Sequence, residues 1–250
     1  MTREGGSGLK ISLAAWSLHR AFFARELDQL GMLQTCAELG IGGFELVNTF
    51  FPSPQYAYLR HMKKRADELG VELLLIMCDL EGDLAHVERE KRVQAARNHR
   101  KWIDIAGVLG CHGIRVNARG DDTDPAAMRE RAAEGLALLL DYAAGTGVDV
   151  VIENHGGLSS DAAWLVSLIE LVGSPHLGTL PDFGNFPPEI DRPLRRRREA
   201  HASREGRQRQ VLRLRAGRQR DDDRLSAHDR HRQAPRLPGL HRHRVRGRPA

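Results

Sequence analysis

The feature that most constrains the fold is a regular alternation of β-rich and helical segments, which begins at Lys10 and repeats about every 25–35 residues. Six short apolar runs are predicted to be strands, over residues 10–16, 42–47, 71–77, 113–117, 148–154 and 177–183. Helical patterns separate them, over residues 26–39, 58–69, 89–109, 122–145 and 159–172. Within the fourth of these, Asp124 is a predicted N-cap and Pro125 the first helical residue. Strands that alternate with helices in this way pair in parallel and carry the helices outside, so the sequence predicts an α/β fold.

Two architectures fit this alternation, an open doubly wound sheet and a (β/α)8 TIM barrel. The segment after the first predicted strand reads WSLHRAFF, and it lacks the glycine-rich loop with which doubly wound domains bind dinucleotide phosphates. A barrel of about 250 residues has eight βα units, whereas six are recognisable here. The missing loop weakens the dinucleotide-binding form, but the alternation alone leaves both architectures open, and a TIM barrel built from this chain would have six intact units.

The charge distribution divides the chain near Arg192. Residues 192–250 contain 20 of the 38 Lys and Arg residues and 6 of the 33 Asp and Glu residues, a net charge of +14, so residues 1–191 carry −9. We expect a flexible N-terminus at residues 1–9, the incomplete barrel at 10–192 and a disordered Arg-rich tail at 193–250. The sequence contains no apolar signal segment and no run of about 18 apolar residues, which predicts a soluble cytoplasmic protein.

Polar and charged residues recur where the predicted strands end. The candidate site residues among them are Glu45, Asn117, Arg119, Glu153, His155, Asp182 and Asn185, and others at these ends are His19, Asn48, Cys78, Asp79 and Asn154. The carboxyl ends of all strands of a barrel meet at one rim, where such enzymes hold their chemistry. A carboxylate such as Glu153 or Asp182 is costly to bury unless it is paired or binds a metal. Because the two follow neighbouring strands, we predict that they bind one divalent cation, Mn²⁺ or Mg²⁺, with Co²⁺ and Zn²⁺ as alternatives.

Structural roles remain alternatives for several of these residues. Glu45 could form an ordinary salt bridge, His155 could hold the loop that follows it, and Asp182 could cap a turn before FGNFPP. Asn117 and Arg119 are candidate substrate contacts through their position at the rim alone.

The segments VVIENHGGLSSDAAWLVSLIE and LGTLPDFGNFP resemble the sugar phosphate isomerase/epimerase family, the xylose-isomerase-like TIM barrels. ISLAAWSLHRAFF and IGGFELVNTFF are similar to its first two strands, and the resemblance extends from about Lys10 to Arg192. It implies a divalent metal held by a glutamate on strand five, an aspartate on strand six, a third group on strand seven and a glutamate on strand eight. Glu153 and Asp182 match the first two. Asn185 stands where several relatives have a substrate-contacting histidine.

The chemistry that the resemblance implies is isomerisation or epimerisation of a small sugar or sugar phosphate. The metal would polarise a carbonyl and a hydroxyl, and a carboxylate, here Glu153, would move the proton through an enediolate. Strands seven and eight should lie in residues 193–250, which do not resemble them. We therefore expect an enzyme by family that is impaired in this chain, with weak metal binding and no useful turnover.

The sequence after Arg192 has the composition of a gene read out of frame. From Pro193 on it contains no Lys, Ile, Met, Phe, Tyr, Trp, Cys, Asn or Thr, so it cannot bury a core. With a suitable choice of third codon bases, HRHRVRG together with Arg248 reads IGIEYEG one base later, as expected for strand eight and its glutamate. Three further segments can be read as barrel elements in the same frame. We hypothesise a one-base insertion or miscall near Arg192–Pro193.

Two other functions remain open. The Arg-rich tail could bind nucleic acid on a degenerate barrel, although a basic arm usually mixes Lys with Arg and this one has no Lys. A non-catalytic sugar-binding barrel is the second, which the pair of carboxylates argues against. The partner expected in the leading hypothesis is a small sugar or sugar phosphate, with no membrane and no nucleic acid, and a homo-oligomer is left open.

Overall fold

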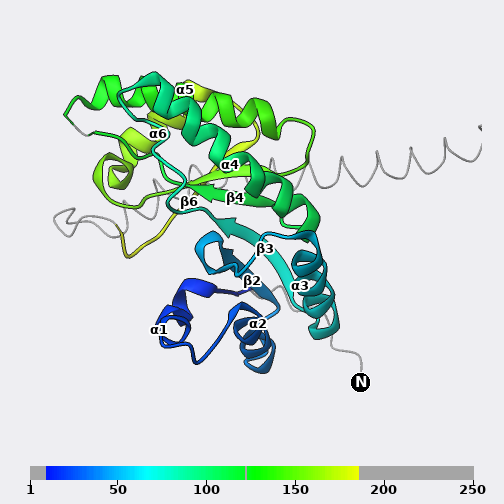
Figure 1. Cartoon of the computed structure of the whole chain (residues 1–250). Helices are drawn as coiled ribbons and strands as arrows, with labels where there is room; N and C mark the ends of the chain where they lie inside the picture. Colours follow the sequence, from blue (N-terminus) through cyan, green and yellow to red (C-terminus); the bar gives the residue numbers. More distant parts are fainter. Residues whose placement is uncertain (1–9, 122, 186–250) are drawn as a thin grey trace, which may run out of the picture. The chain divides into compact units, whose positions relative to one another are not determined.

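The six predicted strands form one parallel sheet in sequence order, as a computed structural model of residues 10–121 and 123–185 shows (Figure 1). Their bounds are β1 Ser12–Ala14, β2 Gly43–Val47, β3 Glu72–Met77, β4 Gly113–Val116, β5 Asp149–Glu153 and β6 Leu177–Leu180. Every neighbouring pair of strands is parallel. The α/β class and all six predicted strands are therefore confirmed.

The helices connect successive strands, and α3, α4, α5 and α6 pack side by side in that order (Figure 1). Their bounds are α1 His19–Phe23, α2 Gln29–Glu38, α3 Tyr56–Leu69, α4 Arg89–Leu109, α5 Pro125–Ala143 and α6 Ala162–Val172, with 3-10 turns η1 Ala15–Leu18, η2 Asn48–Phe50 and η3 Gly157–Ser160. The side chain of Asp124 accepts hydrogen bonds from the N–H groups of Ala126 and Ala127, as its predicted N-cap role requires.

Several boundaries differ by a few residues from the sequence-based expectation, and two of these differences have clear local reasons. The first strand ends at Ala14 because the chain turns into η1 at Ala15. The helix expected from residue 26 starts at Gln29, because the side chain of Asp28 accepts the N–H of Gly31 and so caps the helix there. Both differences move an end by a few residues and leave the element in place.

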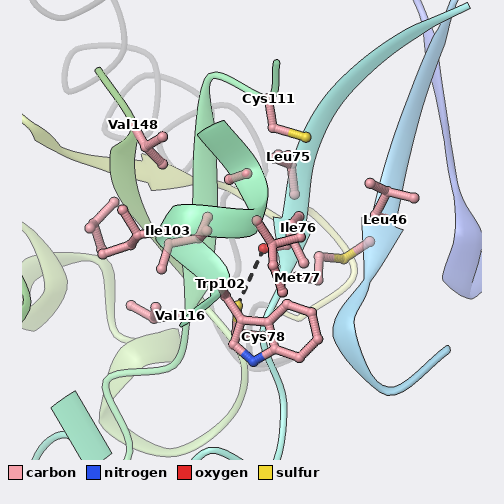
Figure 2. Close-up of a cluster of buried hydrophobic side chains, with 14 of the residues drawn as sticks. Leu46, Leu75, Ile76, Met77, Cys78, Trp102, Ile103, Cys111, Val116 and Val148 are labelled. Carbon is pink, nitrogen blue, oxygen red and sulfur yellow. Dashed lines mark hydrogen bonds between the residues drawn. The ribbon is translucent and has the colours of Figure 1, made fainter. Parts of the chain in front are cut away.

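The core lies between the sheet and the helices that cover it (Figure 2). Leu46 of β2, Ile76 of β3 and Ile103 of α4 have no exposed surface, and Trp102 of α4 lies beside Cys78, just past the end of β3. Strands buried in this way hold their carboxyl ends in fixed positions, and those ends carry the candidate site residues.

Strands seven and eight of the barrel, the flexible N-terminus and the Arg-rich tail are predictions that lie outside the described residues. Within those residues, β1 and β6 are the two edge strands of the sheet. None of the helices described between Lys10 and Asn185 is long and apolar enough to cross a membrane.

Candidate functional site at the carboxyl ends of the strands

Glu153 and Asp182 lie together at the carboxyl ends of β5 and β6. Glu153 is the last residue of β5 and is only 8% exposed, and Asp182 follows β6 by two residues. The side-chain amide of Asn185 joins them, because its Nδ2 donates to Oε1 of Glu153 over 3.4 Å and to Oδ2 of Asp182 over 3.1 Å. One amide donor shared by two carboxylates marks a position from which a cation could contact both. The structure thus brings three of the predicted site residues together.

Two buried asparagines fix the loops that carry aspartates at this rim. Asn154 donates from Nδ2 to the carbonyl of Asp182 over 2.7 Å and accepts the N–H of Asp182 at Oδ1 over 2.6 Å. Asn48, directly after β2, makes the same two bonds with the backbone of Asp79, over 2.8 and 2.9 Å. We call these pairs the Asn154–Asp182 clamp and the Asn48–Asp79 clamp. Each satisfies backbone groups just beyond a strand and ties the ends of two neighbouring strands together.

Arg115 is a site residue that the sequence analysis missed. It lies inside β4, is 4% exposed, and donates from Nη1 to Oδ1 of Asp79 over 2.7 Å. Its Nε lies 2.8 Å from Oε2 of Glu153, so the charges are paired, although the N–H does not point along a hydrogen bond to that oxygen. The signal in the sequence is a charged residue within the apolar run GIRV, which is costly to bury without a partner.

The carboxyl groups around Arg115 have pKa values that shift in opposite directions. Burial raises the pKa of Glu153, and the nearby charges of Asp182 and Asp79 raise it further, against the opposing charges of Arg115 and His155. Burial also acts to raise the pKa of Asp79, but the hydrogen bond and charge of Arg115 outweigh it, and the pKa of Asp79 is lowered. Glu153 is thus the more readily protonated of the two acids.

Three further candidates line a cavity of about 250 Å³ formed by the loops after β4 and β5. They are Asn117, Arg119 and His155, and the rest of the lining is Ala118, Gly120, Met128 and the loop from Gly156 to Ser159. Asn117 donates from Nδ2 to Oδ1 of Asp79 over 3.2 Å, which places the cavity next to the charged cluster. The side chains of Arg119 and His155 are exposed. Their position is compatible with the predicted contact to substrate, which stays a prediction.

Glu45 takes a different place from the one expected. It lies in the middle of β2 rather than at its end, and its Oε1 accepts a hydrogen bond of 2.6 Å from the hydroxyl of Ser12. The pairing of β2 with β3 is irregular between Phe44 and Glu45, and such bulges reorient a side chain. The hydrogen bond to Ser12 is a structural role, and the predicted contact of Glu45 with substrate remains untested.

The described residues include two carboxylates whose chemistry fits part of a divalent metal site. Oε2 of Glu153 is paired with Nε of Arg115, whereas Oε1 accepts only the amide of Asn185 among the described residues and so keeps a lone pair for a cation. Carboxylate oxygens such as those of Glu153 and Asp182 suit Mg²⁺ and Mn²⁺. Between Lys10 and Asn185, leaving out residue 122, no group of three or more His, Cys, Asp and Glu side chains converges as a metal site. The two residues therefore fit half of a metal shell, and the ligands expected on strands seven and eight lie outside the described residues.

Comparisons with known proteins show the fold and the family of the chain. Solved structures of similar fold include D-psicose 3-epimerase with D-tagatose from Clostridium cellulolyticum H10 (TM-score 0.63, 18% identity, 78% of this chain and 71% of that chain). They also include 3-keto-D-glucoside 4-epimerase from E. coli (0.59, 18%, 70% and 70%) and the probable 3-DHS dehydratase from Bacillus anthracis (0.57, 17%, 71% and 64%). No curated protein matches the sequence. Residues 33–233 match the family described as xylose isomerase-like TIM barrel. The chain belongs to this family of xylose isomerase-like TIM barrels.

Proposed function

We propose that this chain derives from a divalent-metal-dependent isomerase or epimerase of a small sugar or sugar phosphate. The observation that carries the proposal is the convergence of Glu153 and Asp182 on the single amide of Asn185. Membership of the family supports it, as do the sugar epimerases among the proteins of similar fold. The proposed metal is Mn²⁺ or Mg²⁺.

Glu153 and Asp182 are the residues that would hold the metal, which when bound supplies polarisation of the carbonyl and hydroxyl of the sugar. Glu153 is also the base that takes a proton from the substrate carbon next to the carbonyl, which gives an enediolate, and a proton returns to the substrate to form the product. A raised pKa suits this role, because a general base works best when its pKa is close to the working pH. Asn185, Asn117, Arg119 and His155 contact the substrate, and Glu45 is a further proposed contact.

Arg115 holds Glu153 in place for this reaction. The guanidinium is fixed by its hydrogen bond to Asp79, and Asp79 is fixed by the Asn48–Asp79 clamp. A buried arginine with two carboxylate partners has few other positions open to it, so the Glu153 side chain against it is confined as well. Arg115 is therefore a positioning residue.

The chain of 250 residues is an impaired form of this enzyme if residues 193–250 are read out of frame. The first test is to sequence the gene across the codons for residues 190–195. We expect one surplus base there, and the corrected protein should interconvert an aldose and a ketose, or two epimers, in the presence of Mn²⁺. A gene without a surplus base would contradict the hypothesis of a frame error.

The activity test compares the corrected protein with two variants. Glu153→Gln should abolish turnover, and removal of metal with a chelator should do the same. Glu170→Gln, on the exposed face of α6, is the matched control and should leave turnover unchanged. Turnover that survives both chelation and Glu153→Gln would contradict the proposed mechanism, and manganese-dependent turnover by the 250-residue chain would contradict its impairment.

A further inference from the structure

We infer that the cavity lined by Arg119 and His155 binds the anionic group, a phosphate or a carboxylate, of a small hydroxylated substrate. This inference rests on the proposed function, because it names the class of substrate that the same rim would take. Its four supports are the charge of the lining, the fixed shape of one wall, the link to the carboxylates and the size of the space.

The charge of the lining is one-sided. Among the described residues of the lining, Arg119 and His155 are the ionisable ones, and none is Asp or Glu. Neither the guanidinium nor the imidazole forms a hydrogen bond or an ion pair with another side chain of the described residues. A guanidinium presents several N–H donors in one plane, which match two oxygens of a phosphate or carboxylate. An arginine that has no carboxylate partner among the described residues is therefore suited to an anion.

The loop after β5 forms a wall of fixed shape. Gly156 and Gly157 have φ values of +80° and +56°, in the region that glycine adopts at low cost. The hydroxyl of Ser159 accepts the N–H of His155 over 3.0 Å, and that of Ser160 accepts the N–H of Gly156 over 2.9 Å. These bonds hold the backbone of the loop before any ligand arrives, and a preformed wall lowers the entropy cost of binding.

Asn117 links the cavity to the charged cluster. Its Nδ2 is bound to Asp79, whereas its Oδ1 is buried and receives no hydrogen bond from the described residues. A carbonyl oxygen without a donor is a natural partner for a substrate hydroxyl. His155 follows Glu153 by two residues in the chain, and it shares the cavity with Asn117 and Arg119. If Arg119 and His155 hold the anionic group of the substrate, its hydroxylated carbons would lie next to Asn117 and toward Glu153.

The size of the space sets an upper limit on the ligand. A volume of about 250 Å³ lies below the range of about 300–1,000 Å³ that is usual for drug-sized ligands. Met128 and Leu158 give it an apolar side. A phosphorylated or carboxylated sugar of a few carbons fits these limits, and a dinucleotide does not.

The test is a metal-free titration of the full 250-residue chain in the presence of a chelator and at constant ionic strength. The probes are inorganic phosphate, glycolate and a neutral hexose, and the readouts are the dissociation constant and the NMR signals of the His155 ring. We compare the chain with Arg119→Gln and with the matched control Arg97→Gln, an exposed arginine of α4 outside the cavity. The control matters because the many arginines after residue 192 also attract anions.

We expect Arg119→Gln to weaken binding of phosphate, glycolate or both by about tenfold or more, because it removes a charge-assisted contact. Arg97→Gln should change nothing, and His155→Gln should weaken binding in the same direction as Arg119→Gln. The anion that binds more tightly separates a phosphorylated from a carboxylated substrate. Equal binding by the chain and by Arg119→Gln would overturn the inference, as would phosphate binding that leaves the His155 signals unmoved.

The result is independent of the proposed metal site, because no metal is present in the titration. If phosphate binding depends on Arg119 while the corrected protein does not bind Mn²⁺ at Glu153 and Asp182, the anion site stands and the proposed function fails. If Mn²⁺ binds there and neither anion responds to Arg119→Gln, the inference is wrong and the substrate of the proposed enzyme is a neutral sugar.

Discussion

The Asn48–Asp79 clamp and the Asn154–Asp182 clamp use the same two hydrogen bonds but end in different electrostatic surroundings. The carboxylate of Asp79 accepts from Arg115 and from Asn117, so it is committed to a neighbouring cation. The carboxylate of Asp182 accepts only the N–H of Gly184 and the amide of Asn185 among the described residues. The same two backbone hydrogen bonds thus position both aspartates. Among the described residues, the carboxylate of Asp79 is paired with a cation and that of Asp182 is not.

This difference shows why an acidic residue at a strand end does not define a metal ligand by itself. Both aspartates follow parallel strands, and both are held by a buried asparagine from the preceding strand. Their roles separate through Arg115, which forms ion pairs with Asp79 and with Glu153, whereas Asp182 has no such pair among the described residues. The predictions below test that separation, from the largest expected effect to the smallest.

The largest effect is expected for Arg115→Met. Removing one partner of a buried ion pair typically lowers the free energy of unfolding by about 3–5 kcal/mol, and here Asp79 and Glu153 would both lose their cation. Urea unfolding followed by circular dichroism measures the change. Arg115→Lys should recover part of the loss, and Arg97→Met, on the exposed surface, should change stability by less than about 0.5 kcal/mol. A loss below about 1 kcal/mol for Arg115→Met would show that the pair does not hold the site.

The next effect is expected for the two clamps. Asn48→Ala and Asn154→Ala each leave the N–H and the carbonyl of an aspartate without their partners, which lowers the free energy of unfolding by about 1–3 kcal/mol. Both losses should appear in urea unfolding. Only Asn154→Ala should also weaken Mn²⁺ binding, because it releases Asp182. If both variants weakened Mn²⁺ binding equally, the claim that only the Asn154–Asp182 clamp positions a metal-binding carboxylate would be wrong.

Much of the fold follows from local sequence signals. The alternation of strands and helices and the Asp124 cap are readable, because each depends on neighbouring residues and on the burial of one face. The pair of Glu153 and Asp182 is also readable, since the order of strands in a barrel makes their ends neighbours.

Arg115 and the place of Glu45 were not predicted, for two different reasons. Arg115 points from inside a strand toward acids on the strands at either side, and a search limited to the residues after each strand passes over it. The irregular pairing at Glu45 depends on the register between β2 and β3, which no local pattern of residues specifies.

The smallest effect is a pH dependence of opposite sign for the two acids that Arg115 contacts. The pKa of Asp79 is lowered by folding, so this group stabilises the protein above its unfolded pKa, and the contribution is lost as pH falls through the folded value. The pKa of Glu153 is raised, so the protein loses stability as pH rises from the unfolded pKa through the folded value.

Urea midpoints measured between about pH 3 and pH 7 check these signs. Relative to the unchanged chain, Asp79→Asn should become less stable as pH rises through this range, whereas Glu153→Gln should become more stable. Glu170→Gln serves as the control for a carboxylate that is exposed. Parallel curves for Asp79→Asn and Glu153→Gln would mean that Arg115 does not separate the two acids.

The most direct test of the central claim is Mn²⁺ binding, measured by electron paramagnetic resonance, in the 250-residue chain and in its Asp182→Asn and Asp79→Asn variants. The account predicts that Asp182→Asn weakens binding by about tenfold or more, since even partners outside the metal shell are worth about 10–100-fold, and that Asp79→Asn has a clearly smaller effect. Equal weakening by both variants, or no weakening by Asp182→Asn, would contradict the assignment of Glu153 and Asp182 as the metal-binding half of the site.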